Sequence, residues 1–330
     1  MPTRRRALLV TALLLLLALA SGVLALLVGS YAVAPAEVWA ALTGGPGGHG
    51  GEVVLSLRLP RALAAFGCGA LLGLAGALMQ VLLRNPLADP YVLGVSGGAA
   101  VGALGAMLAG ASLLVMHSGA FVGALAAMLL VFGLARGDGS WTHSRLLLTG
   151  VIVAAGCGAA VALILSVAPE QKLHGMLFWL MGDVSLARSP WPALAMLAAG
   201  LLAALPLARD LNLLARGDAV ARTLGVGVDG LRGGIYVLAS LLTAVAVTTA
   251  GSIGFVGLVV PHLVRLAIGN DQRVLLPAAA LAGGSLLLLA DTLARTLVAP
   301  QQLPVGVLTA LVGVPAFLFL LSRQPAGGRG

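Results

Sequence analysis

Charged side chains are scarce in this sequence: they make up 9% of its 330 residues, and Lys172 is the single lysine. A soluble domain carries about 25% charged residues, so an ordinary soluble protein is excluded. Gln171 precedes the lysine, which excludes a phosphate-binding loop of the GxxxxGK[ST] type. The two cysteines, Cys68 and Cys157, lie within apolar runs, which favours packing roles over a disulfide or a metal site.

Two further function classes lack their usual patterns. The formal charge of +8 would suit nucleic acid, but the basic residues lie at the ends of apolar runs and form no patch. We therefore expect no nucleic-acid partner. His, Asp, Glu and Cys form no cluster along the chain, so we expect no catalytic residue, no metal and no cofactor on it.

Apolar residues dominate instead. They make up 60% of the chain, the mean hydropathy is +1.07, and 46 glycines suit closely packed membrane helices. Apolar runs of about 20 residues predict an all-α polytopic membrane protein, formed by one domain over residues 1–330. The eighth run contains Pro261, so a broken or tilted helix is expected there. The ten predicted spans are 7–29, 61–83, 92–110, 119–135, 146–168, 190–208, 233–251, 254–268, 274–296 and 304–322.

The basic residues give the orientation. With both termini in the cytoplasm, fourteen of the nineteen basic residues lie inside, as the positive-inside rule requires. The first span follows Arg4–Arg6 like a signal peptide, but its apolar run continues to Gly29, so we expect an uncleaved helix. The five basic residues on the outside are Arg58, Arg61, Lys172, Arg188 and Arg295.

One cytoplasmic stretch, residues 209–232, is polar. It holds seven of the thirty charged residues, with apolar residues interleaved at helical spacing. This pattern predicts a short amphipathic platform between two spans, which a partner could bind. Charges deep within the spans are nearly absent, and Asp291 with Arg295 suggests a local pair near an outer end. Transport energy is therefore expected from a partner at the platform; the alternative is an ion-coupled secondary transporter with sites on broken helices.

Several motifs occur in a characteristic order. They are LRLPR at 57–61, AGALMQ at 75–80, RNPLADP at 84–90, LGVSGGA at 93–99, WLMG at 179–182, LNLLARGD at 211–218, GFVGLVVPHLVR at 254–265, DTLAR at 291–295 and LPVG at 303–306. In this order and spacing the chain resembles the FecCD/BtuC-like permease subunits of type II ABC importers, which move ferric siderophores, haem and vitamin B12.

The resemblance implies a BtuC-like permease of about ten helices in the bacterial inner membrane. It implies a homodimer, two ATP-binding subunits that hold the ATP and magnesium, and a periplasmic binding protein. The chain would then be no enzyme. Nothing in the sequence separates iron complexes from cobalamin, although an iron complex is favoured because such systems are the most numerous in the family.

The resemblance also assigns candidate site residues. The ATPase would contact a helix-turn-helix at 211–225 through Leu213, Leu214, Arg216, Asp218, Ala221, Arg222, Leu224 and Gly225. The binding protein would contact Arg58, Arg61 and Arg295, which break the positive-inside rule. Met79 and Gln80 would line the transport path, and a cytoplasmic gate would lie at Thr142, His143 and Ser144.

Overall fold

Long helices form most of the protein. The computed structural model describes residues 4–45, 48–136, 143–187 and 189–323, and within these ranges every regular element is a helix. Six of them are long and apolar enough to cross a membrane. These six are α1 (Arg4–Leu27), α4 (Leu59–Leu82), α6 (Leu113–Arg136), α7 (His143–Val167), α12 (Val228–Ala250) and α14 (Gln272–Ala294).

Four further apolar helices complete the predicted set. Three are shorter: α5 (Val95–Leu108), α13 (Val256–Ile268) and α15 (Val305–Arg323). The fourth, α9 (Trp191–Ala204), joins α10 (Ala208–Leu214) at a bend of 68°. Each of the ten predicted spans thus corresponds to one helix, and the predicted all-α fold is confirmed.

Short helices connect the spans at both ends. On the outer side lie α2 (Pro35–Leu42), α3 (Gly48–Val53), η1 (Val54–Arg58), α8 (Glu170–Met181) and η3 (Val184–Leu186). On the inner side, α11 (Asp218–Thr223) follows α10, and η2 (Pro90–Leu93) precedes α5.

Helix α4 lies at the centre of the protein and packs against α9, α12, α13 and α14. Glycines make this packing close: a Cβ at Gly69 would overlap the carbonyl of Gly283 on α14, and a Cβ at Gly76 would overlap that of Gly257 on α13. The same close approach joins α5 to α6. Small residues at these contacts let backbones come together where lipid provides no hydrophobic driving force.

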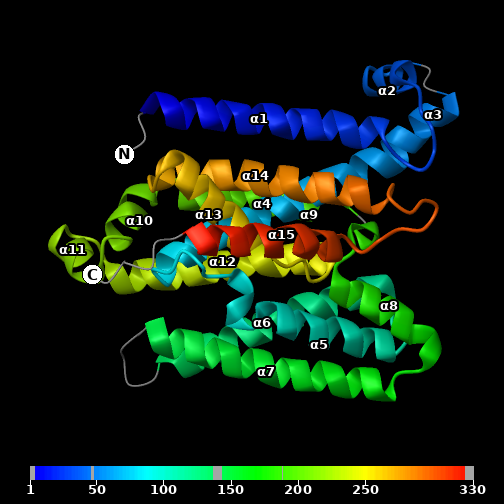
Figure 1. Cartoon of the computed structure of the whole chain (residues 1–330). Helices are drawn as coiled ribbons and strands as arrows, with labels where there is room; N and C mark the ends of the chain where they lie inside the picture. Colours follow the sequence, from blue (N-terminus) through cyan, green and yellow to red (C-terminus); the bar gives the residue numbers. More distant parts are fainter. Residues whose placement is uncertain (1–3, 46–47, 137–142, 188, 324–330) are drawn as a thin grey trace.

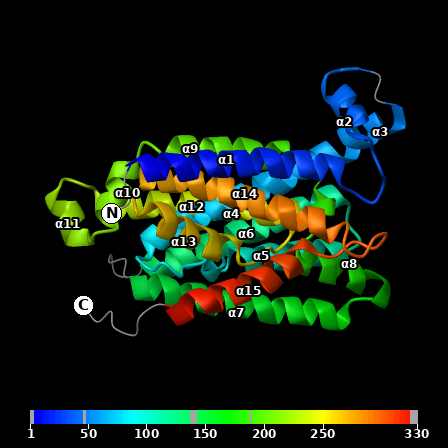
Figure 2. The ribbon, with the colours of Figure 1, turned by 45° about the horizontal axis from the view of Figure 1, so that its top comes forward.

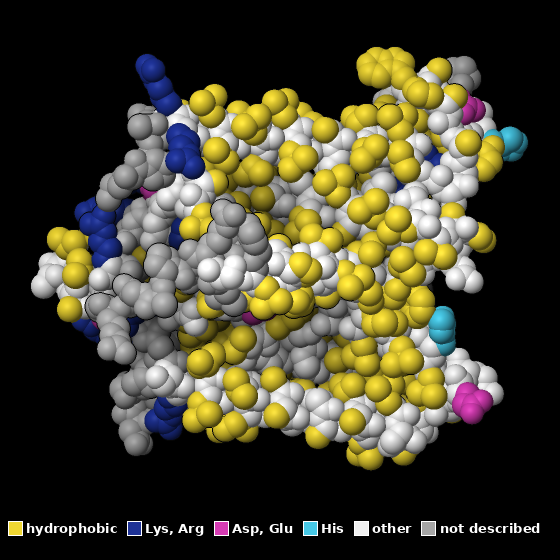
Figure 3. Space-filling view, in the orientation of Figure 1, with side chains coloured by type: hydrophobic (Ala, Val, Ile, Leu, Met, Phe, Trp, Pro, Cys, Tyr) yellow, Lys and Arg dark blue, Asp and Glu magenta, His cyan; other side chains and the backbone are white. Residues whose placement is uncertain are grey.

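The outer helices expose apolar side chains. The apolar window of the helix that ends at Leu82 is 89% buried, whereas those of α1 and α7 are 11% buried. A broad band of hydrophobic side chains covers the middle of the visible face, and Lys and Arg gather at one end (Figure 3). That end carries the start of α1, the end of α15 and the pair α10–α11 (Figures 1 and 2). The arrangement agrees with the predicted cytoplasmic location of the polar stretch.

Helix α13 is short because it begins late. Of the two expected alternatives, a broken or a tilted helix, the break is excluded, because α13 continues through Pro261. Instead, residues 251–255 are non-helical and lie against the start of α5. The Ser96 and Ser252 hydroxyls are 2.9 Å apart, and the backbone N–H of Ile253 donates to the Tyr91 hydroxyl at 2.9 Å. These bonds satisfy backbone and side-chain groups that lipid could not.

Candidate functional site

The platform, defined here as residues 208–225, is the helix-turn-helix that the sequence predicts. Helix α10 ends at Leu214, and the chain turns at Gly217, whose φ of 121° favours glycine. Helix α11 ends at Thr223, Gly225 follows with φ 82°, and the N–H of Val226 returns to the carbonyl of Ala221 at 3.0 Å. Gly225 therefore terminates α11.

An ion pair fixes the platform to the spans. Asp218 begins α11, and its carboxylate accepts a hydrogen bond from Arg232 of α12 at 2.7 Å. Arg84, in the loop after α4, lies 3.9 Å from the same carboxylate. The Asp218 side chain is 31% exposed and also pairs with the body of the protein, so its contact with an ATPase stays a prediction. Asp218 therefore links α11 to the beginning of α12 and to the loop that follows α4.

Asn212 makes a second attachment, which the sequence alone did not reveal. Its side-chain N–H donates to Asp271 at 2.8 Å, and its carbonyl oxygen accepts the backbone N–H of Gln272 at 2.9 Å. These contacts join α10 to the first residues of α14. An asparagine within the apolar run LNLL is the signal that could have indicated a specific hydrogen-bonding role.

The apolar side of the platform differs from the prediction. Leu214 is 1% exposed and Ala221 is fully buried, so both hold the platform against the spans and neither can contact a partner here. Leu224 is 56% exposed, and Val220, one helical turn earlier, is 40% exposed. Val220 was not predicted. The signal for it was the i, i+4 spacing of two apolar residues on α11.

Polar residues surround this exposed pair. Arg216 and Arg222 are exposed, as predicted, and Leu213 is half-buried. Arg222 also contacts Asp229 at the start of α12, at 3.0 Å. The exposed apolar pair with a basic rim is the kind of surface that a partner protein can bind.

At the outer end, two of the three predicted docking arginines are buried. Arg58 is 4% exposed and donates to the backbone carbonyls of Leu26 at 2.6 Å, Leu27 at 3.0 Å and Tyr31. Arg295 donates to the carbonyl of Ala25 at 2.6 Å. The carbonyls of Ala25, Leu26 and Leu27 belong to the last turn of α1, where cations are favourable. The structure thus corrects the expectation of two surface residues: Arg58 and Arg295 fasten the end of α1.

Arg61 is the member of this group that reaches the surface. It contacts the carboxylate of Asp291 at 2.8 Å and donates to Gln302 at 2.8 Å. Asp291 is 1% exposed and also faces Arg295 at 3.8 Å, so the predicted local pair is confirmed. The closer partner, Arg61, comes from α4, 230 residues away in the sequence. Docking of a partner through Arg61 stays a prediction.

The predicted path residues lie inside the chain. Met79 is fully buried, and Gln80 is buried with its N–H group on the carbonyl of Leu258 at 3.1 Å. Both side chains are buried within this one chain, and their role in lining a transport path stays a prediction. At the predicted gate, Thr142 and the side chain of His143 lie outside the described residues, and Ser144 is exposed in the first turn of α7.

Comparison with known proteins identifies the family. The model of the FecCD transport family matches residues 14–323, nearly the whole chain. The chain belongs to the FecCD transport family. Members of this family are permease subunits of ABC transporters, so the FecCD chain is not itself an enzyme. Among the described residues, no three His, Cys, Asp or Glu side chains gather as a metal site.

The names of related proteins state different substrates. The hemin transport system permease HmuU of Yersinia pestis is 43% identical over 83% of this chain and 84% of its own length. The cobalamin import system permease BtuC of Halobacterium salinarum is also 43% identical, over 82% and 73%. A solved metal-chelate type ABC transporter in an inward-facing conformation is 32% identical, with a TM-score of 0.83, over 96% of this chain and 100% of that chain.

Proposed function

We propose that this protein is the permease of an ATP-driven importer for a large metal chelate, either an iron complex or cobalamin. Two copies would form the transport path in the cytoplasmic membrane of a bacterium. Two ATP-binding subunits would bind the platforms, and a periplasmic binding protein would deliver the chelate. The observation that carries this proposal is the platform itself, an exposed apolar pair on two short helices attached to the spans at defined points.

The attachments suggest how a push on the platform reaches the path. Movement of α11 would pull Asp218 against Arg232 of α12, and movement of α10 would pull Asn212 against the start of α14. Both helices pack on the central α4. Displacement of a few short contacts would therefore shift two spans together, as in other transitions where packed helices change arrangement.

The substrate is proposed only as a class. A haem permease and a cobalamin permease are equally similar to this chain, at 43% identity. An iron complex is preferred because it is the commonest cargo of the family that the sequence resembles. The path needs to bind its cargo only weakly, because selectivity can reside in the binding protein.

Reconstitution tests this proposal. The purified chain, its ATP-binding subunit and its binding protein would be placed in proteoliposomes, and uptake of haem, ferric siderophores and cobalamin measured. We expect uptake that needs ATP and the binding protein. Uptake that persists without ATP and instead follows a proton or sodium gradient would overturn the proposal in favour of an ion-coupled transporter.

The gate is a separate part of the proposal. Other members of the family often have small hydroxyl residues at the position of His143, and we propose that this larger side chain narrows the inner end of the path. His143→Ser should then raise the basal ATPase activity or the leak of substrate from proteoliposomes. If both stay at the level of the unaltered protein, the gating role of His143 is wrong.

A further inference from the structure

A hollow of about 550 Å³ opens beside α12 near the cytoplasmic end of the protein. Its walls come from α4, α6, α9, the start of α10 and the first half of α12, and nearly all of its lining is apolar. Among the lining residues are Leu78, Phe132, Leu207 and three glycines of α12, namely Gly230, Gly233 and Gly234.

These three glycines have no packing reason within the described chain. A Cβ at Gly230, Gly233 or Gly234 would meet nothing within 4 Å, whereas a Cβ at Gly69 or Gly76 would overlap a backbone carbonyl. Glycine within a helix is less stable than alanine. Gly230, Gly233 and Gly234 are spaced i, i+3 and i+4, so they lie on one face of α12. Their lack of side chains keeps the hollow open.

The position of the hollow indicates what occupies it. From Gly230 to Leu241 the lining follows α12 for about 16 Å, at 1.5 Å per residue. This length is about half of the 30 Å hydrocarbon core, that is, one leaflet. The charged lining residue, Asp229, lies at the cytoplasmic end, where headgroups lie, and contacts Arg222 at 3.0 Å. Val237, which lines the hollow, is 37% exposed, as a residue that faces lipid is.

We propose that the hollow binds one acyl chain of a phospholipid from the cytoplasmic leaflet. The depth suits a chain in one leaflet, and the glycines form a smooth floor for it. Leu207 and Leu211 line the hollow at the bend between α9 and α10. The bound chain therefore packs behind the platform and supports its first helix.

The test fills the hollow without disturbing the packing. Gly230→Leu/Gly234→Leu adds side chains where the structure has open space, so the fold should persist. Gly22→Leu on α1 is the matched control, because a Cβ there also meets nothing within 4 Å and the site lies outside the hollow. The purified full chain would be delipidated and titrated with phosphatidylglycerol, phosphatidylethanolamine or phosphatidylcholine, with bound lipid counted by native mass spectrometry.

We expect the unaltered chain and Gly22→Leu to retain one lipid that the double variant loses. Added lipid should raise the melting temperature of the first two and not of the third, because a ligand stabilises only the protein that binds it. Equal retention by all three would overturn the proposal. So would a disulfide between two copies carrying Val237→Cys in a Cys157→Ser background, because a second copy would then cover the hollow. If the double variant does not fold, Gly234→Val replaces it.

Discussion

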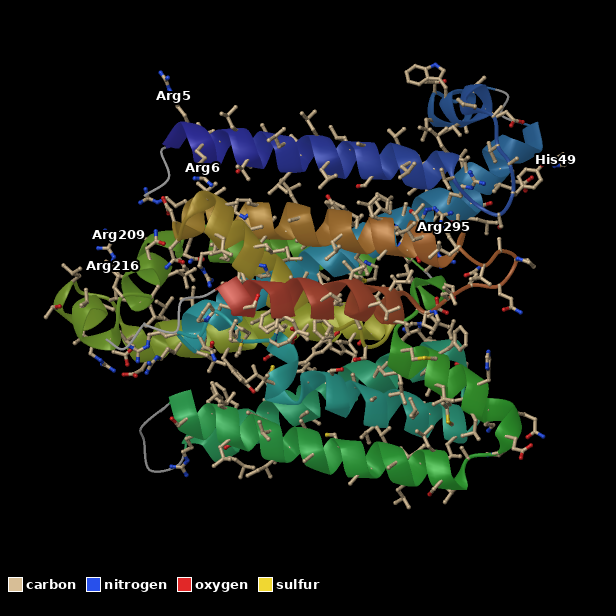
Figure 4. The ribbon with its side chains drawn as sticks, viewed as in Figure 1. Arg5, Arg6, His49, Arg209, Arg216 and Arg295 are labelled. Carbon is tan, nitrogen blue, oxygen red and sulfur yellow. The ribbon has the colours of Figure 1, made fainter. Side chains whose placement is uncertain are left out.

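The two ends of this protein use arginine in opposite ways. At the outer end, Arg58 and Arg295 are buried and bound to backbone carbonyls at the end of α1. At the cytoplasmic end, Arg209 and Arg216 project from the platform, whereas Arg295 lies among the helices at the opposite, outer end (Figure 4). The outer end is therefore held together by buried arginines, whereas the platform presents Arg209 and Arg216 to the surroundings.

This difference has an energetic consequence. A buried guanidinium needs partners for its charge and its N–H groups, so removal of one partner is costly. Exposed ion pairs contribute about 0–1 kcal/mol, because water already solvates both groups. Substitutions at the outer end should therefore lower the stability of the fold, whereas substitutions on the platform should change the response to a partner.

The largest effect is expected from Asp291→Asn. This change removes the carboxylate that faces both Arg61 and Arg295 and leaves two cations in a buried site. We expect a loss of about 3–5 kcal/mol in the free energy of unfolding, measured by thermal or denaturant unfolding in detergent. The matched control is Asp229→Asn at the exposed Arg222 pair, with an expected change below about 1 kcal/mol. Equal losses in the two variants would remove the distinction between the ends.

Arg58→Met should have the next largest effect. Its side chain keeps much of the apolar volume but leaves the carbonyls of Leu26, Leu27 and Tyr31 without their donor. We expect a loss of about 2–3 kcal/mol, because buried acceptors without partners are unfavourable. Hydrogen exchange should rise at the end of α1, and Arg58→Lys should recover part of the loss. An unchanged exchange pattern would show that Arg58 does not fasten α1.

Much of this fold could be predicted from the sequence. Each predicted span has its helix, because apolar runs in lipid must satisfy their backbones within one segment. The platform could also be located, since the polar stretch stands out against apolar neighbours. The contact between Tyr91 and Ile253, which lies beside the start of α13, could not be predicted, because no local pattern reveals it.

The site was harder to predict than the fold. A pattern of residues shows that Arg58 is charged and lies near an outer end, but it does not show whether the side chain points inward. The partner of Asp291 is 230 residues away, so the Arg61 contact needed the packed structure. For the same reason Leu214 and Leu224 are alike in the sequence, yet one is buried and the other exposed.

Asp218→Asn tests a partly exposed contact, which joins the platform helix α11 to the span α12. The amide keeps the shape of the side chain but weakens its contacts with Arg232 and Arg84. We expect a small loss of stability, about 1 kcal/mol, together with faster hydrogen exchange in α11. In the reconstituted transporter, uptake per ATP hydrolysed should fall, because the platform would move without pulling α12. Unchanged uptake per ATP would show that the Asp218 contact transmits no movement.

The smallest effect on stability, and the sharpest one on a partner, is expected from Leu224→Asp. This side chain is 56% exposed and makes no contribution to the core, so the free energy of unfolding should change by less than about 0.5 kcal/mol. Association with the ATP-binding subunit should weaken by about 10–100-fold, as for a central apolar contact of an interface. The affinity would be measured with the unaltered permease and the variant, each in nanodiscs.

The control for this prediction is Thr223→Asp, which places the same charge beside Leu224 on an exposed polar position. Leu202→Asp would be a poor control, because that residue faces lipid. Weakening by Leu224→Asp and not by Thr223→Asp would show that the apolar contact matters. Equal weakening by both would mean that added negative charge near Arg222 is responsible, and no weakening would exclude Leu224 from the interface.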